Sequence, residues 1–296
     1  MALAAVSALA LIAQETTLHI NARLVNVFVN VTDKTGAIVG GLTRDDFQIA
    51  EDGRPQTIAV FERQSEMPLM MTLAIDTSGS TFKDRAVEQE ASHHFVHALL
   101  RQQDKMSLIE FATYVTERTH FTNNASQIDR GLNSLRGGDA TALYDAIYLG
   151  CQSLGPLDGR KVMVIVSDGG DTANDKTYAD ALEQALRNEV MIYSLIDVPI
   201  EASAGRDLGG EHALITLAEQ TGGKSFYIAN EGGLDKAFSR VSDDLRTQYL
   251  LGYYPARQVP GTNFHRVQVT IPRAAARELN IRHRTGYYMD SPVKGK

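Results

Sequence analysis

The chain has 296 residues, 43% of them apolar and 22% charged, which is enough for one large domain or two smaller ones and excludes wholesale disorder. Its formal net charge is −7, with acidic and basic residues interspersed. This balance disfavours a nucleic-acid partner, because a phosphate-binding protein gathers Lys and Arg on one face. The single cysteine, Cys151, excludes an intramolecular disulfide and lies in an apolar helical stretch, where we expect it to be a buried core residue.

Residues 1–18 are a possible signal segment. The first fourteen carry no charge, and this run fits the apolar region of a signal peptide but is too short to span a bilayer. The pattern is incomplete, since no Lys or Arg precedes the run. Composition and length therefore predict an exported protein (periplasmic, cell-surface or secreted) without a transmembrane span.

Residues 19–66 have the pattern of a β module. Residues 19–32 are rich in Val, Ile and Phe with partial alternation, and turn signals follow at 33–36 and 51–55. Between these turns, Thr43 to Asp46 resembles a capping box and predicts a short helical turn.

Residues 67–247 change character and predict an α/β domain. Short, nearly continuous apolar runs at 69–75, 106–112, 162–166 and 190–196 are mostly separated by helical patterns. Strands that are apolar on both faces and alternate with helices indicate a parallel sheet covered on both sides. The segment 114–119 follows its predecessor too closely for a crossover, so we expect it to be an antiparallel edge strand.

Residues 248–296 return to a strand pattern, with candidates at 249–254, 264–271 and 279–284. Neither terminal group of strands can bury a face alone. We therefore predict that both flanks pair into one small β-sandwich, with the α/β domain inserted between them. The predicted fold class is a doubly wound, mostly parallel, Rossmann-like α/β sheet with this sandwich attached.

Polar side chains suited to a metal ion follow the predicted strands of the α/β domain. The first strand ends in Asp76, Thr77, Ser78, Gly79 and Ser80, and the strand at 162–166 is followed by Ser167 and Asp168. A glycine-rich loop at 137–141 ends in Thr141 before another helix. Because ligands bind at the carboxyl ends of strands where the strand order reverses, these loops converge if the two strands are neighbours.

The five candidate metal ligands are Asp76, Ser78, Ser80, Thr141 and Asp168. Two carboxylates and three hydroxyls are hard oxygen donors, which suit Mg²⁺, with Mn²⁺ or Ca²⁺ possible, rather than Zn²⁺. Since hydroxyls are neutral, the ion stays electrophilic and is able to accept a carboxylate from outside the chain. That chemistry is typical of a binding site.

The order Asp76-x-Ser78-x-Ser80, then Thr141, then Ser167-Asp168-Gly169 resembles the metal-ion-dependent adhesion site (MIDAS) of the von Willebrand factor A (VWA) family. The resemblance covers about residues 67–244 and implies that Ser78, Ser80 and Thr141 contact the metal, with Asp76 and Asp168 holding it directly or through water. It also implies a protein partner that supplies an Asp or Glu carboxylate. The flanks, at residues 42–47 and 249–254, resemble a bacterial subfamily of exported VWA proteins.

The sequence leaves two other classes of function open. A Mg²⁺-dependent phosphoryl-transfer hydrolase also places an Asp after the first strand, but it needs a second acid where Ser78 stands. Neither a nucleophile elbow, a P-loop nor a dinucleotide fingerprint follows any strand. We therefore predict no enzyme, no catalytic residue and no organic cofactor. The third class is a structural subunit in which the metal only rigidifies the site.

Overall fold

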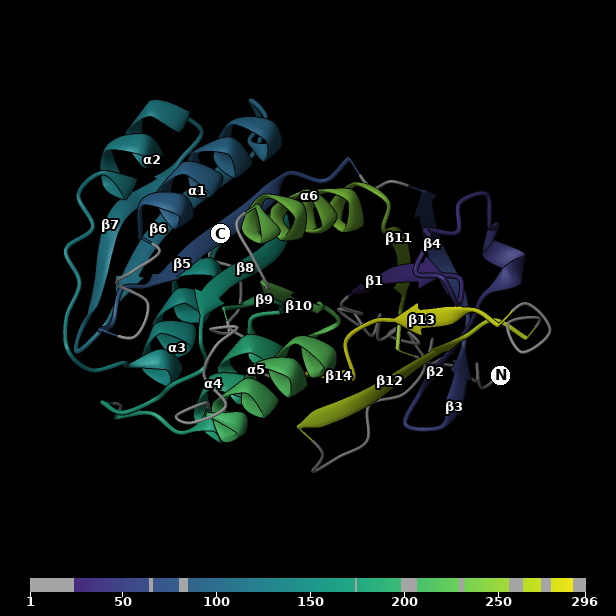
Figure 1. Cartoon of the computed structure of the whole chain (residues 1–296). Coiled ribbons are helices and arrows are strands. Elements are labelled where there is room, and N and C mark those ends of the chain that lie inside the picture. The colour runs from purple at the N-terminus through teal and green to yellow at the C-terminus, as the bar shows by residue number, and fades with distance from the viewer. Residues whose placement is uncertain are drawn as a thin grey trace, which may run out of the picture.

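The computed structural model describes residues 24–63, 66–79, 85–173, 175–197, 207–228, 232–255, 263–272 and 278–289. A central sheet is sandwiched between two layers of helices, and a separate pair of antiparallel sheets lies at one end of the molecule (Figure 1). The possible signal segment, residues 1–18, falls outside the described residues.

The central sheet has six strands in the order β10-β9-β8-β5-β6-β7. All neighbours pair in parallel except β6 and β7, which are antiparallel, so the predicted edge strand is confirmed. The strands are β5 (Leu69–Asp76), β6 (Lys105–Phe111), β7 (Val115–Thr122), β8 (Arg160–Ser167), β9 (Val190–Asp197) and β10 (Ser225–Ile228).

The strands β5, β6, β8 and β9 are buried on both faces, which explains why they are nearly continuous apolar runs rather than alternating ones. Along β5, Leu69, Met71 and Leu73 face one hydrophobic cluster, whereas Met70 and Ala74 belong to the other. Helices α1 (Arg85–Leu99), α2 (Ala125–Leu132) and α6 (Gly233–Arg246) cover the first face (Figure 1). Helices α3 (Leu143–Leu154), α4 (Tyr178–Arg187) and α5 (Leu208–Thr221) cover the second, where Cys151 is fully buried as expected.

The two flanks form a β-sandwich, and the predicted fold class is confirmed. One sheet has the order β13-β1-β11-β4 and the other β14-β12-β2-β3, so each contains strands from both ends of the chain. Alternating residues of the two sheets, among them Val27, Ile49, Leu251 and Val267, share one buried cluster. The strands are β1 (Val25–Thr32), β2 (Gln48–Glu51), β3 (Arg54–Gln56), β4 (Ile58–Arg63), β11 (Tyr249–Tyr253), β12 (Phe264–Thr270), β13 (Asn280–Arg282) and β14 (Gly286–Tyr288).

Two details of the flanks bear on the sequence predictions. The short 3-10 helix η1 (Arg44–Asp46) begins after Thr43, and the Asp46 side chain accepts a hydrogen bond from the Thr43 amide at 2.8 Å, as the capping box predicted. The strand β14 lies beyond the last predicted strand and was not anticipated, because three residues carry too little pattern. None of the helices in the described ranges has both the length and the apolar character needed to cross a membrane.

Candidate metal centre

The strand order reverses beside β5, because β6 lies on one side of it and β8 on the other. Asp76 is the last residue of β5 and Ser167 the last residue of β8, so both stand at the carboxyl edge of the sheet. The Ser167 hydroxyl donates to Asp76 Oδ2 at 2.6 Å. The neighbouring strands required by the sequence prediction are therefore present, and they create the crevice in which α/β sheets bind ligands.

Asp76 is a buried carboxylate whose charge is disfavoured by burial more than its hydrogen bonds favour it. Its side chain accepts a hydrogen bond from the Ser78 amide at 2.9 Å, and the residue is 1% exposed. Burial is the main cause that raises the pKa of Asp76 to about 6, and the nearby charge of Asp168 raises it further. The hydroxyl of Ser167 and the amide of Ser78 only partly offset these effects. A cation here would remove the penalty of the buried charge.

Thr141 and Asp168 face the same small space beside Gly170. A Cβ added at Gly170 would lie 3.3 Å from Asp168 Oδ1 and 4.0 Å from Thr141 Oγ1. The Gly170 amide donates to Asp168 Oδ1 at 3.0 Å, which fixes that carboxylate. The two side chains thus approach the same space, in which a larger residue at position 170 would crowd the Asp168 carboxylate.

Backbone hydrogen bonds tie the three loops to one another. The Gly138 amide donates to the Thr77 carbonyl at 3.1 Å, which joins the second loop to the first. The Thr141 carbonyl accepts from the Thr172 amide at 2.8 Å, and the Thr141 amide donates to Thr172 Oγ1 at 3.0 Å. Thr141 is therefore held through both its backbone amide and its backbone carbonyl, which fixes the position of the residue.

Acidic residues around these loops act as caps. Asp171 Oδ1 accepts from the Leu143 amide at 3.0 Å and caps α3, whose own N-cap residue, Ala142, has no side chain able to do so. Asp145 accepts from the amides of Asp175 and Lys176. Their negative charges also raise the cation affinity of this edge of the sheet, although neither carboxylate belongs to the predicted ligand set.

Four of the five predicted ligands stand at this edge. Asp76, Ser78 and Thr141 are buried and Asp168 is half-buried. Ser80 lies outside the described residues, so its position is not described. The chemistry of this set suits a hard cation, because it offers two carboxylates and two hydroxyl groups and no nitrogen or sulfur ligand.

Glu110 was not anticipated from the sequence, although it organises the site. This β6 residue is 4% exposed, and its Oε1 accepts from Thr77 Oγ1 at 3.0 Å and from the Gly137 amide at 2.9 Å. Its other oxygen, Oε2, accepts from Arg118 Nε at 2.5 Å. Burial opposes its charge, but these donors prevail and hold the pKa of Glu110 below its usual value. One carboxylate thus joins the loop after β5 to the loop that carries Thr141.

The loop that carries Asp168 packs against the first turn of α5 without space for side chains. Gly169 has a φ of +92°, and a Cβ added at Gly210 would lie 1.7 Å from the Gly169 carbonyl oxygen. We expect Gly210→Ala to lower the free energy of unfolding by about 1–3 kcal/mol through overpacking, and to weaken Mg²⁺ binding because Asp168 is displaced. Thermal unfolding with and without Mg²⁺ measures both effects.

The neighbouring glycine provides the matched control for this prediction. A Cβ at Gly209 would meet only Asp207 Oδ1, at 3.2 Å, and this side chain is able to shift. Gly209→Ala is expected to stay within about 1 kcal/mol of the parent protein, because Ala is also the better helix former. Equal losses in the two variants would contradict a specific contact between α5 and the Asp168 loop.

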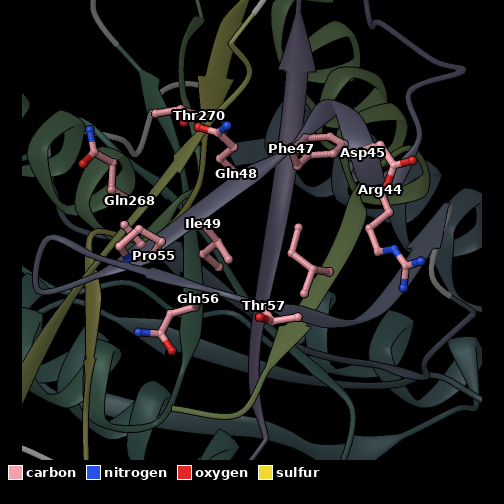
Figure 2. Close-up of a pocket in the computed structure, with 12 residues that line it drawn as sticks. Arg44, Asp45, Phe47, Gln48, Ile49, Pro55, Gln56, Thr57, Gln268 and Thr270 are labelled. Atoms are coloured by element: carbon pink, nitrogen blue, oxygen red, sulfur yellow. The ribbon is translucent and has the colours of Figure 1, made fainter. Parts of the chain in front are cut away.

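A separate pocket of about 610 Å³ lies in the β-sandwich (Figure 2). Residues of η1, β2, β3 and β12 line it, among them Arg44, Phe47, Ile49, Pro55 and Gln268. None of the predicted metal ligands contributes to this pocket. It is therefore a feature of the flanks and not part of the candidate metal centre.

Comparisons with known proteins agree with this fold. Residues 71–170 match the family model described as the von Willebrand factor type A domain. A von Willebrand factor type A structure from Catenulispora acidiphila superposes with a TM-score of 0.51 at 11% identity, over 91% of this chain and 75% of that one. Proximal thread matrix protein 1 from the mussel byssus, solved with a zinc-occupied MIDAS motif, gives 0.53 at 14% identity over 68% of this chain and 50% of that one.

A third structure, the conserved hypothetical protein BatB from Bacteroides thetaiotaomicron, gives a TM-score of 0.48 at 18% identity, over 60% of this chain and 98% of that one. No curated protein matches the chain. At these identities the structural likeness concerns the fold.

The sheet order, the two helical layers and the polar crevice at the switch point define a doubly wound α/β domain with a candidate cation site. Together with the family match over residues 71–170, they give this domain the fold of a von Willebrand factor type A domain.

Proposed function

We propose that this chain is a divalent-cation-dependent protein-binding or adhesion module that carries Mg²⁺ on Asp76, Ser78, Ser80, Thr141 and Asp168. Two observations support the proposal most: Asp76 ends β5 and Asp168 directly follows the neighbouring strand β8, and Asp168 and Thr141 approach the same glycine, Gly170. Mn²⁺ or Ca²⁺ would suit the same oxygen donors.

The role of the cation follows from the charge of its ligands. The protein supplies two carboxylates, while the remaining donors are neutral hydroxyls, so the bound ion keeps an affinity for one more anionic oxygen. An Asp or Glu side chain of a partner protein would occupy that position. The partner carboxylate and the metal would then form a charge-assisted contact at the centre of the interface.

A binding role suits this site better than an enzymatic one. Phosphoryl transfer with an Asp after the first strand needs a second acid or a positioned base, and Ser78 stands at the position where that acid would be. The Ser78 amide donates to Asp76 Oδ1 and the Ser167 hydroxyl donates to Oδ2, so both carboxylate oxygens hold the loops together. We propose that the protein is not an enzyme and that it is an exported bacterial protein, as its first residues and its resemblances suggest.

The proposal is tested by capture of a partner from native extract with Mg²⁺ and with EDTA. Mg²⁺ is expected to raise the melting temperature, because a ligand that binds only the folded state stabilises it. EDTA should release the captured partner, and Asp168→Ala should abolish both the thermal shift and the capture. Acetate or free Glu at high concentration should compete with the partner for the open position on the metal.

Asp139→Asn is the matched control, since Asp139 is an exposed acid in the loop of Thr141. It should leave both the thermal shift and the capture unchanged. A partner that stays bound in EDTA while Mg²⁺ still raises the melting temperature would assign the metal a structural role only. Phosphatase turnover that depends on Asp76 would overturn the assignment as a binding module.

A further inference from the structure

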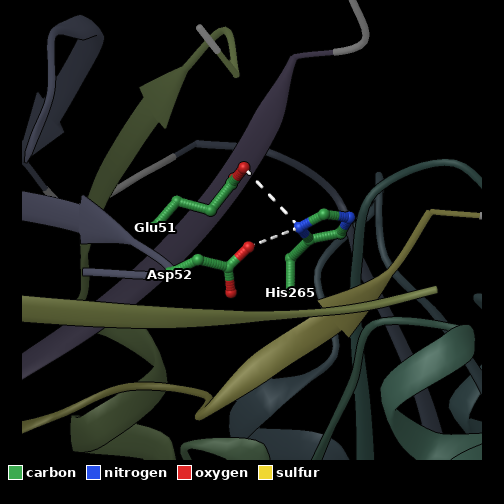
Figure 3. A group of neighbouring side chains, drawn as sticks. All are labelled: Glu51, Asp52 and His265. Atoms are coloured by element: carbon green, nitrogen blue, oxygen red, sulfur yellow. Dashed lines mark hydrogen bonds and ion pairs between the residues drawn. The ribbon is translucent and has the colours of Figure 1, made fainter. Parts of the chain in front are cut away.

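A second group of side chains able to bind a metal lies in the β-sandwich, away from the candidate metal centre of the VWA domain. Glu51 ends β2, Asp52 occupies the following turn, and His265 lies on the neighbouring strand β12 (Figure 3). Glu51 pairs with Arg54 across the turn, whose two residues, Asp52 and Gly53, have φ values of 49° and 77°. This geometry is that of a type I′ hairpin, in which Asp-Gly is a preferred pair.

Glu51 is a buried carboxylate whose two oxygens have different surroundings. It is 4% exposed, and its Oε2 accepts from Tyr253 at 2.6 Å and from Tyr287 at 2.8 Å. Burial is the main cause that raises the pKa of both phenols, so each hydroxyl keeps its proton and donates. The other oxygen, Oε1, is directed toward His265 and lies 3.8 Å from its Nδ1 (Figure 3).

Asp52 and His265 complete the group. His265 is 1% exposed, and its Nδ1 lies 2.8 Å from Asp52 Oδ2. The second oxygen of Asp52 accepts from the Arg266 amide at 2.9 Å, which turns Oδ2 toward the histidine. One donor atom from each of the three residues therefore lies within 4.8 Å of the other two.

We propose that Glu51, Asp52 and His265 form a second divalent-cation site, of the class that takes Zn²⁺ or a similar first-row transition ion. A tetrahedral Zn²⁺ about 2.0–2.2 Å from each donor places neighbouring donors about 3.3 Å apart. The distances from His265 Nδ1, 2.8 Å to Asp52 and 3.8 Å to Glu51, bracket that value, and the donor atoms of Glu51 and Asp52 lie within 4.8 Å of each other. Three protein ligands leave the fourth position to water.

The ligand atoms of this site differ in kind from those of the candidate metal centre in the VWA domain. An imidazole nitrogen with two carboxylates suits a transition metal, whereas oxygen donors alone suit Mg²⁺. The two tyrosines hold Glu51 in place from different sheets, since Tyr253 lies on β11 and Tyr287 on β14. The Asp52 side chain is 30% exposed and gives the ion a route of entry from solvent.

The test measures Zn²⁺ binding to the full-length Asp168→Asn variant. This variant lacks one of the proposed ligands of the candidate metal centre in the VWA domain. Equilibrium dialysis with excess Mg²⁺ is expected to give one Zn²⁺ per chain. Adding Asp52→Asn should weaken binding at least about 100-fold, and Tyr287→Phe, which only loosens Glu51, about tenfold. With Co²⁺ as the probe, the visible absorption of a tetrahedral ion should appear and should be lost with Asp52→Asn.

Asp33→Asn is the matched control, because Asp33 is another turn carboxylate of the sandwich that accepts backbone hydrogen bonds. It should bind Zn²⁺ like its parent. Asn at position 52 keeps an acceptor for the Arg266 amide and tolerates the positive φ, so this variant is expected to fold. Absence of Zn²⁺ binding at micromolar metal, or equal binding with and without Asp52→Asn, would overturn the proposal and leave a hydrogen-bonded network only.

Discussion

Asp76→Asn is expected to stabilise the protein in EDTA at pH 7.5 and to abolish its stabilisation by Mg²⁺. Burial raises the pKa of Asp76 to about 6, so without a cation the ionised carboxylate destabilises the folded protein at neutral pH. Each pKa unit corresponds to about 1.4 kcal/mol, so replacing the charge with an amide should gain about 1–3 kcal/mol in the free energy of unfolding. The same change removes a proposed ligand, so the binding of Mg²⁺ should be lost with it.

The pH dependence of this effect has a defined sign. A carboxyl group whose pKa is higher in the folded state than in the unfolded one binds a proton more tightly when folded, so stability falls as the pH rises from about 4 to about 6. In EDTA, the parent protein and Asp76→Asn should therefore have similar stability near pH 4. The advantage of the variant should develop with rising pH and be complete above pH 6.

Urea denaturation in EDTA over this pH range measures the difference, and Asp168→Asn serves as a control. Asp168 is half-buried rather than buried, so its neutralisation should gain less stability while still abolishing the Mg²⁺ effect. A loss of stability for Asp76→Asn in EDTA at pH 7.5 would contradict this account of the buried charge. So would a Mg²⁺-dependent rise in its melting temperature.

The fold was predictable because four of the central strands, β5, β6, β8 and β9, are buried on both faces. The runs at 69–75 and 162–166 are apolar at nearly every position, and the helices between them leave only a parallel arrangement. The sandwich was predictable for a different reason, since neither terminal group of strands could cover its own apolar face. The short strand β14 was missed because its three residues carry too little local pattern, and it is defined by its pairing with β12.

The candidate metal centre was predictable in part, because its residues follow strands directly and strand ends determine their position. The role of Glu110 was not predictable from the sequence. It depends on the Arg136 amide, 26 residues later in the chain, and on the Thr77 hydroxyl, 33 residues earlier. His265 and Asp52 are 213 residues apart, and only the pairing of β2 with β12 brings them together. Local sequence carries no signal for such contacts.

Glu110→Ala is expected to lower the free energy of unfolding by about 3–5 kcal/mol, the cost of breaking a buried ion pair. The change leaves the Arg118 guanidinium without its carboxylate and removes the acceptor of the Arg136 and Gly137 amides. Because Glu110 also joins Thr77 to the loop of Thr141, Mg²⁺ affinity should fall by about tenfold or more, as is typical when a residue that orients metal ligands is lost. Urea denaturation and Mg²⁺ titration by calorimetry measure the two effects.

Two further variants separate the charge of Glu110 from its position. Glu110→Gln keeps an oxygen for the amides but loses both the charge and the acceptor opposite Arg118, so it should cost less stability and less Mg²⁺ affinity than Glu110→Ala. Glu117→Gln removes a carboxylate on the next strand, where the side chain is 38% exposed and pairs with His120, and should change neither quantity measurably. If Glu110→Ala destabilises the protein but leaves Mg²⁺ affinity unchanged, Glu110 holds the sheet together without orienting the metal loops. The expected result is instead that Glu110→Ala lowers both stability and Mg²⁺ affinity, with both losses smaller in Glu110→Gln. That result would establish that Glu110 positions the loop after β5 and the loop of Thr141.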